Sequence, residues 1–197
     1  MARLSYPDIE NSSAQVQETF AQLAAPLNIF RMLAHAETCF KPVLRLGGSI
    51  LGKQKLDGKL RELALLHAVK LDGGEYEWVQ HVPIALALGA NDAQIKALET
   101  GKISAPCFDA EEQAVLRFTG EVVERTGASP EALAAVRQTL SEREVVELII
   151  MIGFYMMMAR LTETAGVEID PQKGTDVIDS IKSRVAARAK TREKDQT

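Results

Sequence analysis

Apolar residues recur along most of the chain at the spacing of one face of an α-helix. After Glu62, for example, Leu65, Leu66 and Val69 follow at spacings of three, four and seven residues. The alternation of apolar and polar residues that would indicate a β-strand is never sustained. The pattern therefore predicts an all-α chain.

Several helix starts are marked by residues that can cap the first turn. A Ser, Asp or Asn followed three residues later by Glu or Gln can satisfy two free backbone N–H groups at once. This pattern occurs at Asp72, Asn91, Asp109 and Ser141. Asp57 is expected to cap a helix that runs to about Leu71. Ser129 before Pro130 marks a further start, because proline is tolerated at the first helical position.

Helices are also expected toward both ends of the chain. The upstream ones lie near residues 12–24, 28–37 and 41–51, with limits left open by Pro26, Pro42 and the Gly47-Gly48 pair. Downstream, a long apolar helix should end at Gly166 and Pro171. A final amphipathic helix is expected from about Asp176, running into a solvated tail.

Composition narrows the class of protein. With 197 residues, 46% of them hydrophobic, the chain can bury the core of one domain. Its net charge of -4 provides no basic surface, so no nucleic-acid partner is expected. No segment looks like a secretory signal or a membrane span, so we expect a cytoplasmic protein. Cys39 and Cys107 belong to no motif, which is typical of a reduced protein.

Glu62 is the first candidate for chemistry, because its carboxylate lies on an apolar stripe. Burial disfavours the charged form and raises the pKa of a carboxyl group, which prepares it for proton transfer near neutral pH. The alternative is a structural glutamate that an arginine or a helix end satisfies.

Glu77 and His81 are the second candidates, because residues four apart lie on one face of a helix. A carboxylate in this position could orient the imidazole and raise its basicity, or the two could form a structural pair at the edge of the core. Pro83 predicts a kink or break near His81, which would free the carbonyl of Val79.

A metal site is not predicted. His35, His67 and His81 are scattered and have no nearby cysteine partners, so we expect neither a metal nor a cofactor. Two carboxylates and one imidazole could still bind a divalent ion if Glu62 lay against the second helix.

Residues 60–98, LRELALLHAVKLDGGEYEWVQHVPIALALGANDAQIKAL, resemble the core motif of the carboxymuconolactone decarboxylase and alkylhydroperoxidase D superfamily. Residues 26–51 and 141–170 resemble its flanking helices. The resemblance implies a helical bundle of the alkylhydroperoxidase D type, formed by residues 26–170. It leaves residues 1–25 as an N-terminal extension and 171–197 as a C-terminal helix and tail.

The same resemblance implies a function. In the peroxidase branch a Cys-x-x-Cys pair begins the second helix, but Gly74 and Glu77 occupy those positions here. A thiol peroxidase needs both sulfurs, so the Cys-less decarboxylase branch fits better. That branch implies a lyase without a cofactor, acting on a small carboxylated lactone from aromatic catabolism. A thiol peroxidase and a non-catalytic ligand-binding protein are the alternatives.

The roles that follow are expectations. Glu62, Glu77 and His81 would be catalytic, with Glu77 orienting His81. Substrate would be bound by Tyr76, Trp78 and Arg160, with Arg61 or an arginine from a neighbouring subunit as further cations for its carboxylate.

The long helix is apolar on nearly every face between Val145 and Leu161. Such a helix is expected to be buried on all sides, and in a domain of this size part of it should meet another subunit. The resemblance implies a homo-oligomer as well, a dimer, trimer or hexamer.

Overall fold

The computed structural model describes residues 2–171, and over this range the chain is built from α-helices without a β-strand. The all-α prediction is confirmed. The helices are α1 (Ala14–Ala21), α2 (Asn28–Leu33), α3 (Glu37–Lys53), α4 (Gly58–Asp72), α5 (Glu75–Ala87), α6 (Asp92–Glu99), α7 (Ala110–Arg125), α8 (Pro130–Val136) and α9 (Glu142–Ala165). The helix expected from Asp176 and the tail lie outside the described residues.

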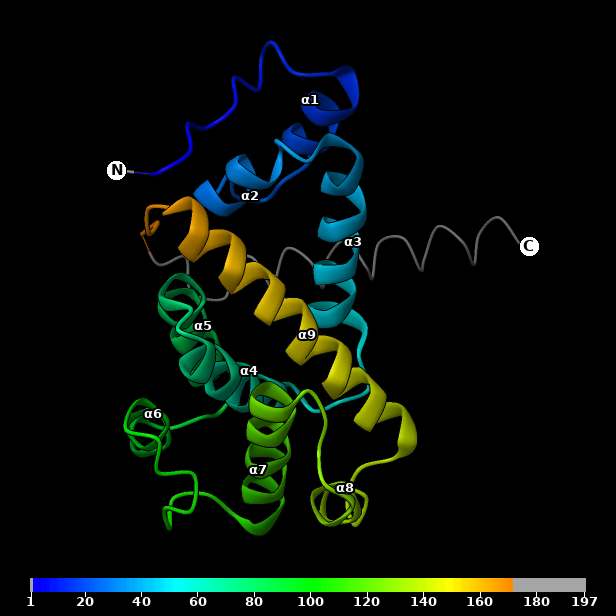
Figure 1. Ribbon diagram of the computed structural model, residues 1–197, viewed down its shortest axis with the longest axis vertical. Coiled ribbons are helices and arrows are strands. Elements are labelled where there is room, and N and C mark those ends of the chain that lie inside the picture. Colours follow the sequence, from blue (N-terminus) through cyan, green and yellow to red (C-terminus); the bar gives the residue numbers. More distant parts are fainter. Residues whose placement is uncertain (1, 172–197) are drawn as a thin grey trace, which may run out of the picture.

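Helix α4 lies at the centre of the bundle and packs against α5, α7 and α9. Every residue from 60 to 69 is buried, so α4 has no solvent-facing side along this stretch. Figure 1 shows α9 crossing the molecule diagonally, with α1 and α2 at one end and α6 and α8 at the other. Any polar side chain on α4 must therefore find its partners inside the protein.

Most predicted helix starts are confirmed. Capping boxes form at Asn91, Asp109 and Ser141. The side chains of Asp57 and Ser129 accept hydrogen bonds from backbone N–H groups three residues later.

The start predicted at Asp72 is wrong. Asp72 is the last residue of α4, Gly73 follows it in a left-handed conformation, and Gly74 precedes α5. The first turn of α5 is satisfied instead from α9, because Glu163 Oε1 accepts a hydrogen bond of 3.0 Å from the N–H of Glu75.

Proline and glycine interrupt the helices less than the sequence suggests. Helix α3 runs through Pro42 and the Gly47-Gly48 pair. Gly47 is needed for packing, since a Cβ there would lie 3.0 Å from the ring of Phe154. Helix α5 likewise continues through Pro83, so the break expected near His81 does not occur.

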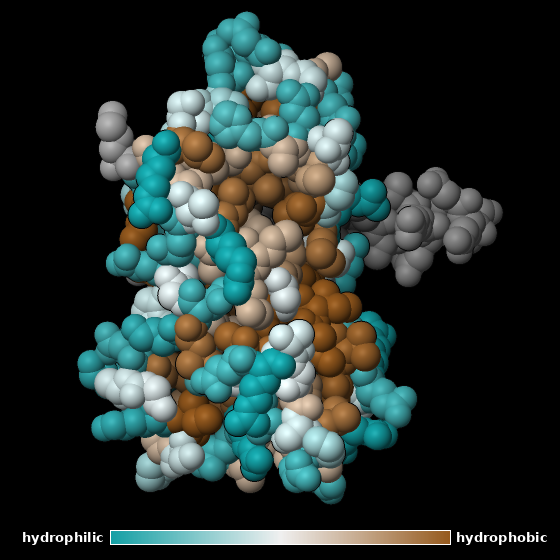
Figure 2. All heavy atoms as spheres, viewed as in Figure 1, coloured by the Kyte–Doolittle hydropathy of each residue, from teal (hydrophilic) through white to brown (hydrophobic). Residues whose placement is uncertain are grey.

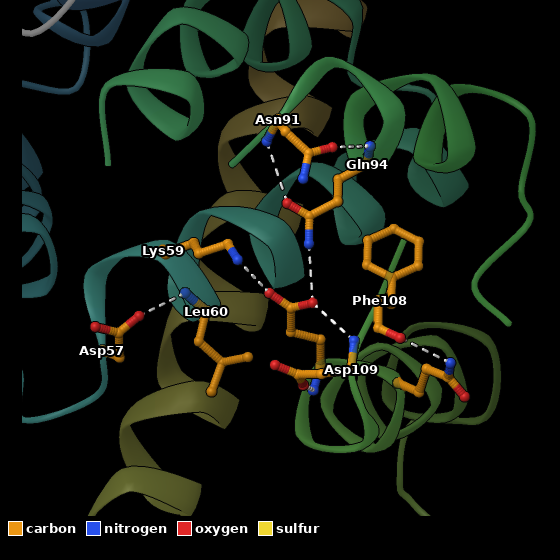
Figure 3. A network of polar contacts seen from close by, with 9 residues as sticks. Asp57, Lys59, Leu60, Asn91, Gln94, Phe108 and Asp109 are labelled. Carbon is orange, nitrogen blue, oxygen red and sulfur yellow. Dashed lines mark hydrogen bonds and ion pairs between the residues drawn. The ribbon is translucent and has the colours of Figure 1, made fainter. Parts of the chain in front are cut away.

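A buried carboxylate joins three helices near the centre. Glu112 of α7 accepts from Lys59 Nζ of α4 at 2.6 Å and from Gln94 Nε2 of α6 at 2.8 Å. One of its oxygens also accepts from the N–H of Asp109 at 3.0 Å (Figure 3). These bonds hold the first turns of α6 and α7 against the first turn of α4.

Helix α9 is buried on one side only. Val146, Ile149, Ile150 and Met157 form a stripe at helical spacing and are between 44% and 53% exposed. Figure 2 shows apolar side chains gathered along the course of α9 on the displayed face. A single chain thus leaves one side of this helix exposed, and the expectation that another subunit covers that side stays a prediction.

By length and composition α9 is the one helix among the described residues that could cross a membrane. Half of its most apolar window is buried inside the protein, where it packs against α4 and α5. A core helix has these properties as well.

The Glu112 network predicts a large stability effect. Glu112→Ala removes the shared acceptor of Lys59 and Gln94, and is expected to lower the free energy of unfolding by about 1.5–3 kcal/mol. Lys96→Ala removes an exposed ion pair with Glu99 and is the matched control, with an expected change below about 0.5 kcal/mol. Urea unfolding measures both. Equal effects would show that the network adds no stability.

The exposed stripe predicts that α9 lies in a subunit interface. Light scattering is expected to find an oligomer, and Ile149→Glu should shift it toward smaller species, because a buried unpaired charge opposes association. Leu133→Glu makes the same change at an exposed leucine of α8 and should leave the assembly intact. A stable wild-type monomer would contradict this prediction.

Candidate functional site

The turn between α4 and α5 brings their polar residues together. Gly73 adopts φ 80°, and Gly74 packs so closely that a Cβ would lie 2.8 Å from Ala159 Cβ and 2.9 Å from Glu77 Oε2. Real Cβ atoms do not approach other atoms this closely. The resemblance implies a cysteine of the peroxidase branch at the position of Gly74, and the packing leaves no room there for a side chain.

Glu62 of α4 is fully buried and is held at both oxygens. Oε1 accepts from Nε and Nη2 of Arg61 at 3.1 and 3.0 Å, and Oε2 lies 2.8 Å from Nδ1 of His81. Burial acts to raise the pKa of Glu62, but His81 and Arg61 outweigh it and hold that pKa below its usual value. The carboxylate is therefore ionised, contrary to the raised pKa expected from its apolar stripe.

His81 of α5 is oriented by Glu62. An ionised carboxylate only accepts hydrogen bonds, so His81 Nδ1 donates and, in the neutral ring, Nε2 carries the lone pair. No hydrogen bond to Nε2 forms within residues 2–171, and the side chain is 10% exposed. Nε2 is thus available to take or give a proton.

Glu77 has a different partner from the one expected. Its two oxygens each lie 3.1 Å from the hydroxyl of Thr162 on α9. Burial raises the pKa of Glu77 to about 7, and the hydrogen bond from Thr162 and the charge of His81 oppose this rise. The imidazole of His81 is oriented by Glu62, so the predicted pairing of Glu77 with His81 is replaced by two separate pairs.

Tyr155 of α9 joins this site, although the sequence did not single it out as a site residue. Its ring meets the His81 ring edge-on, with centroids 4.8 Å apart. Burial raises the pKa of the Tyr155 phenol above its usual value, and the charges of Glu62 and Glu77 add to that effect. Tyr155 lies within a uniformly apolar stretch of sequence, and its position opposite His81 depends on how α9 crosses α5.

The predicted substrate-binding residues have other polar partners. The hydroxyl of Tyr76 donates to Asp170 at 2.6 Å, and Arg160 bonds the side chain of Asp72 and the carbonyl of Met156. Trp78 is half-buried, and its ring faces Lys70 Nζ at 5.4 Å from the centroid. None of these contacts includes the catalytic candidates, and a binding role for these residues stays a prediction.

The remaining candidate donors do not gather into a metal site. Within the described part of the chain, no group of three or more His, Cys, Asp or Glu residues is arranged to hold a metal ion. Cys39 is exposed on α3, and Cys107 is half-buried in the segment between α6 and α7. Glu62 and His81 are bonded to each other, Glu77 is bonded to Thr162, and the Tyr155 ring lies against His81.

Comparison with known proteins identifies the fold and a family match over part of the chain. Residues 38–121, which include Glu62, Glu77 and His81, match the model of the carboxymuconolactone decarboxylase family. A search of curated proteins finds no match.

Three solved structures share the fold. An Agrobacterium tumefaciens protein of unknown function, described as a putative antioxidant defence protein AhpD, is 22% identical, with a TM-score of 0.64 over 71% of this chain and 96% of that one. An alkylhydroperoxidase AhpD core protein from Ralstonia eutropha is 16% identical, with a TM-score of 0.73 over 86% of this chain and 92% of that one. A peroxidase-related protein from Silicibacter has the same values. Residues 38–121 thus match the carboxymuconolactone decarboxylase family, and the chain shares the AhpD-like fold of these structures.

Proposed function

We propose that this protein is a cytoplasmic carboxy-lyase that needs no cofactor and decarboxylates a small carboxylated lactone by acid–base chemistry. The observation that carries the proposal is the 2.8 Å contact between Glu62 and His81 Nδ1, which leaves Nε2 of a buried imidazole available. A histidine oriented in this way by a carboxylate is a suitable general acid or base.

The proposed reaction begins with loss of the carboxyl group. The bond between carbon and carboxylate breaks, carbon dioxide leaves, and the electron pair passes to the lactone as a dienolate. His81 then delivers a proton from Nε2 to carbon, while Glu62 stabilises the imidazolium before the transfer. Glu77, with its pKa near 7, returns a proton to His81.

The substrate carboxylate needs a cation nearby. Arg61 is the guanidinium closest to the catalytic pair, since two of its nitrogens already contact Glu62. Tyr76, Trp78 and Arg160 remain proposed substrate-binding residues, with Arg160 or a neighbouring subunit's arginine as a second cation.

Thiol peroxidase activity is the alternative that the names of the similar structures suggest. It is disfavoured because Gly74 and Glu77 replace the cysteine pair and Gly74 has no space for a side chain. Turnover of an organic peroxide with a dithiol donor, abolished by Cys107→Ser, would favour the peroxidase instead. A non-catalytic binding protein would show neither activity.

The lyase proposal predicts specific losses of activity with 4-carboxymuconolactone. His81→Ala should lower kcat by about 10²–10⁴-fold, the usual contribution of one general acid. Glu62→Gln should lower it too. The double variant should be about as slow as His81→Ala alone, because Glu62 acts through His81.

Two controls accompany that assay. His35→Ala changes an exposed histidine that bonds the carbonyl of Ser5 and should retain wild-type activity. Thermal unfolding of Glu62→Gln checks that this variant is folded, because loss of the Glu62 charge leaves the buried Arg61 unpaired and lowers stability. Full activity in folded His81→Ala would exclude the proposed role.

The pKa of Glu77 predicts a pH dependence. Below about pH 7 Glu77 is neutral and can supply a proton, whereas above it Glu77 is ionised and repels an anionic substrate. The kcat/KM is therefore expected to fall as the pH rises through about 7. In Glu77→Gln the activity should be lower and this fall should disappear. An unchanged pH profile in the variant would assign the titration to another group.

A further inference from the structure

The contact between α5 and α9 is made of two matched pairs. Glu77 faces Thr162, and His81 faces Tyr155, so the two helices run antiparallel at this point. Glu77 and His81 are one turn apart and lie on the same face of α5. Tyr155 and Thr162 are two turns apart and lie on the same face of α9. Each pair therefore combines an ionisable group from α5 with a hydroxyl group from α9.

The two hydroxyls are used differently. Thr162 lies within hydrogen-bonding distance of Glu77 and of backbone carbonyls of its own helix. Tyr155 contacts His81 and Phe154 through ring edges, with centroid distances of 4.8 and 5.3 Å, but its hydroxyl forms no hydrogen bond within residues 2–171. A buried polar group without a partner is unfavourable, so the presence of a hydroxyl here calls for an explanation.

The phenol oxygen is also not completely enclosed. In the described part of the chain, the fully buried side-chain atoms without a partner are Gln54 Oε1 and Thr119 Oγ1, and the Tyr155 oxygen is not among them. Although Tyr155 as a whole is 5% exposed, its oxygen therefore keeps some accessible surface. A small molecule can therefore contact this oxygen.

The surroundings make Tyr155 a donor. Burial and the charges of Glu62 and Glu77 keep the phenol protonated, so it can give a hydrogen bond to an anionic oxygen. A donor already positioned in a dry site needs little reorganisation when negative charge develops on its partner.

We propose that the Tyr155 hydroxyl is a catalytic residue that donates a hydrogen bond to the lactone carbonyl oxygen of the substrate beside His81. This inference rests on the proposed lyase function and identifies the group that stabilises the negative charge formed in that reaction. As carbon dioxide leaves, the electron pair of the broken bond moves onto this oxygen, which becomes the dienolate oxygen. Tyr155 keeps its own proton throughout, and the proton added to carbon comes from His81.

The experiment compares wild-type protein with Tyr155→Phe, which keeps the ring and its contacts with His81. With 4-carboxymuconolactone, kcat should fall about 10²–10³-fold, as for loss of one donor to a developing oxyanion, with little change in KM. Tetronate, the stable enolate of a five-membered lactone, serves as a binding probe in calorimetry. Its affinity should weaken roughly tenfold, the loss expected for one hydrogen bond to a charged oxygen.

Stability and a matched control separate this role from a structural one. Tyr155→Phe should keep or raise the melting temperature, because it removes a hydroxyl without a partner. Tyr6→Phe removes a hydroxyl that accepts from the backbone of Glu168 and should change neither turnover nor tetronate binding.

The two proposals fail in different ways. Wild-type protein that binds tetronate but does not decarboxylate the lactone would overturn the lyase, while weaker binding by Tyr155→Phe would still support the Tyr155 donor. Equal tetronate affinity in both proteins, or no binding to wild type, would overturn the donor. A marked loss of stability in Tyr155→Phe would also overturn it, since the hydroxyl would then have a structural partner.

Discussion

The ionised carboxylate of Glu62, buried at the centre of α4, is the constraint on which the rest of the site depends. Removing a charge from water is costly, and a buried ion persists where its lone pairs are satisfied. Arg61 satisfies one oxygen from the same helix, so the second oxygen requires a donor from elsewhere. His81 supplies it, and this requirement fixes α5 against α4 and sets the direction of the imidazole.

The surroundings of the two buried carboxylates, Glu62 and Glu77, give them different pKa values. Glu62 is bonded by Arg61 and His81 and stays ionised, whereas burial raises the pKa of Glu77 to about 7 despite hydrogen bonds from its own backbone and from Thr162. Two glutamates in one small region are therefore suited to different tasks, one to hold charge and the other to exchange a proton. In the proposed lyase, this division is the physical basis for acid–base chemistry without a thiol.

The sequence predicted the helical class and the caps at Asn91, Asp109 and Ser141, and it named Glu62 and His81, which the structure brings into contact. Those predictions depend on local periodicity and capping, which act within a few residues. It missed Tyr155 and exchanged the partners of His81, because both depend on how α4 and α9 meet α5 across long sequence separations. It also placed a cap at Asp72, where the tertiary contact from Glu163 prevailed.

The tight packing at Gly74 has a consequence for how this site could change over time. Because a side chain at Gly74 would collide with Ala159, a cysteine there requires a compensating change on α9 as well as replacement of Glu77. No single substitution on this chain therefore leads to a paired-thiol enzyme, and each intermediate carries either a packing defect or an incomplete pair. The packing at Gly74 therefore opposes a change from the proposed acid–base site to a paired-thiol site on the same fold.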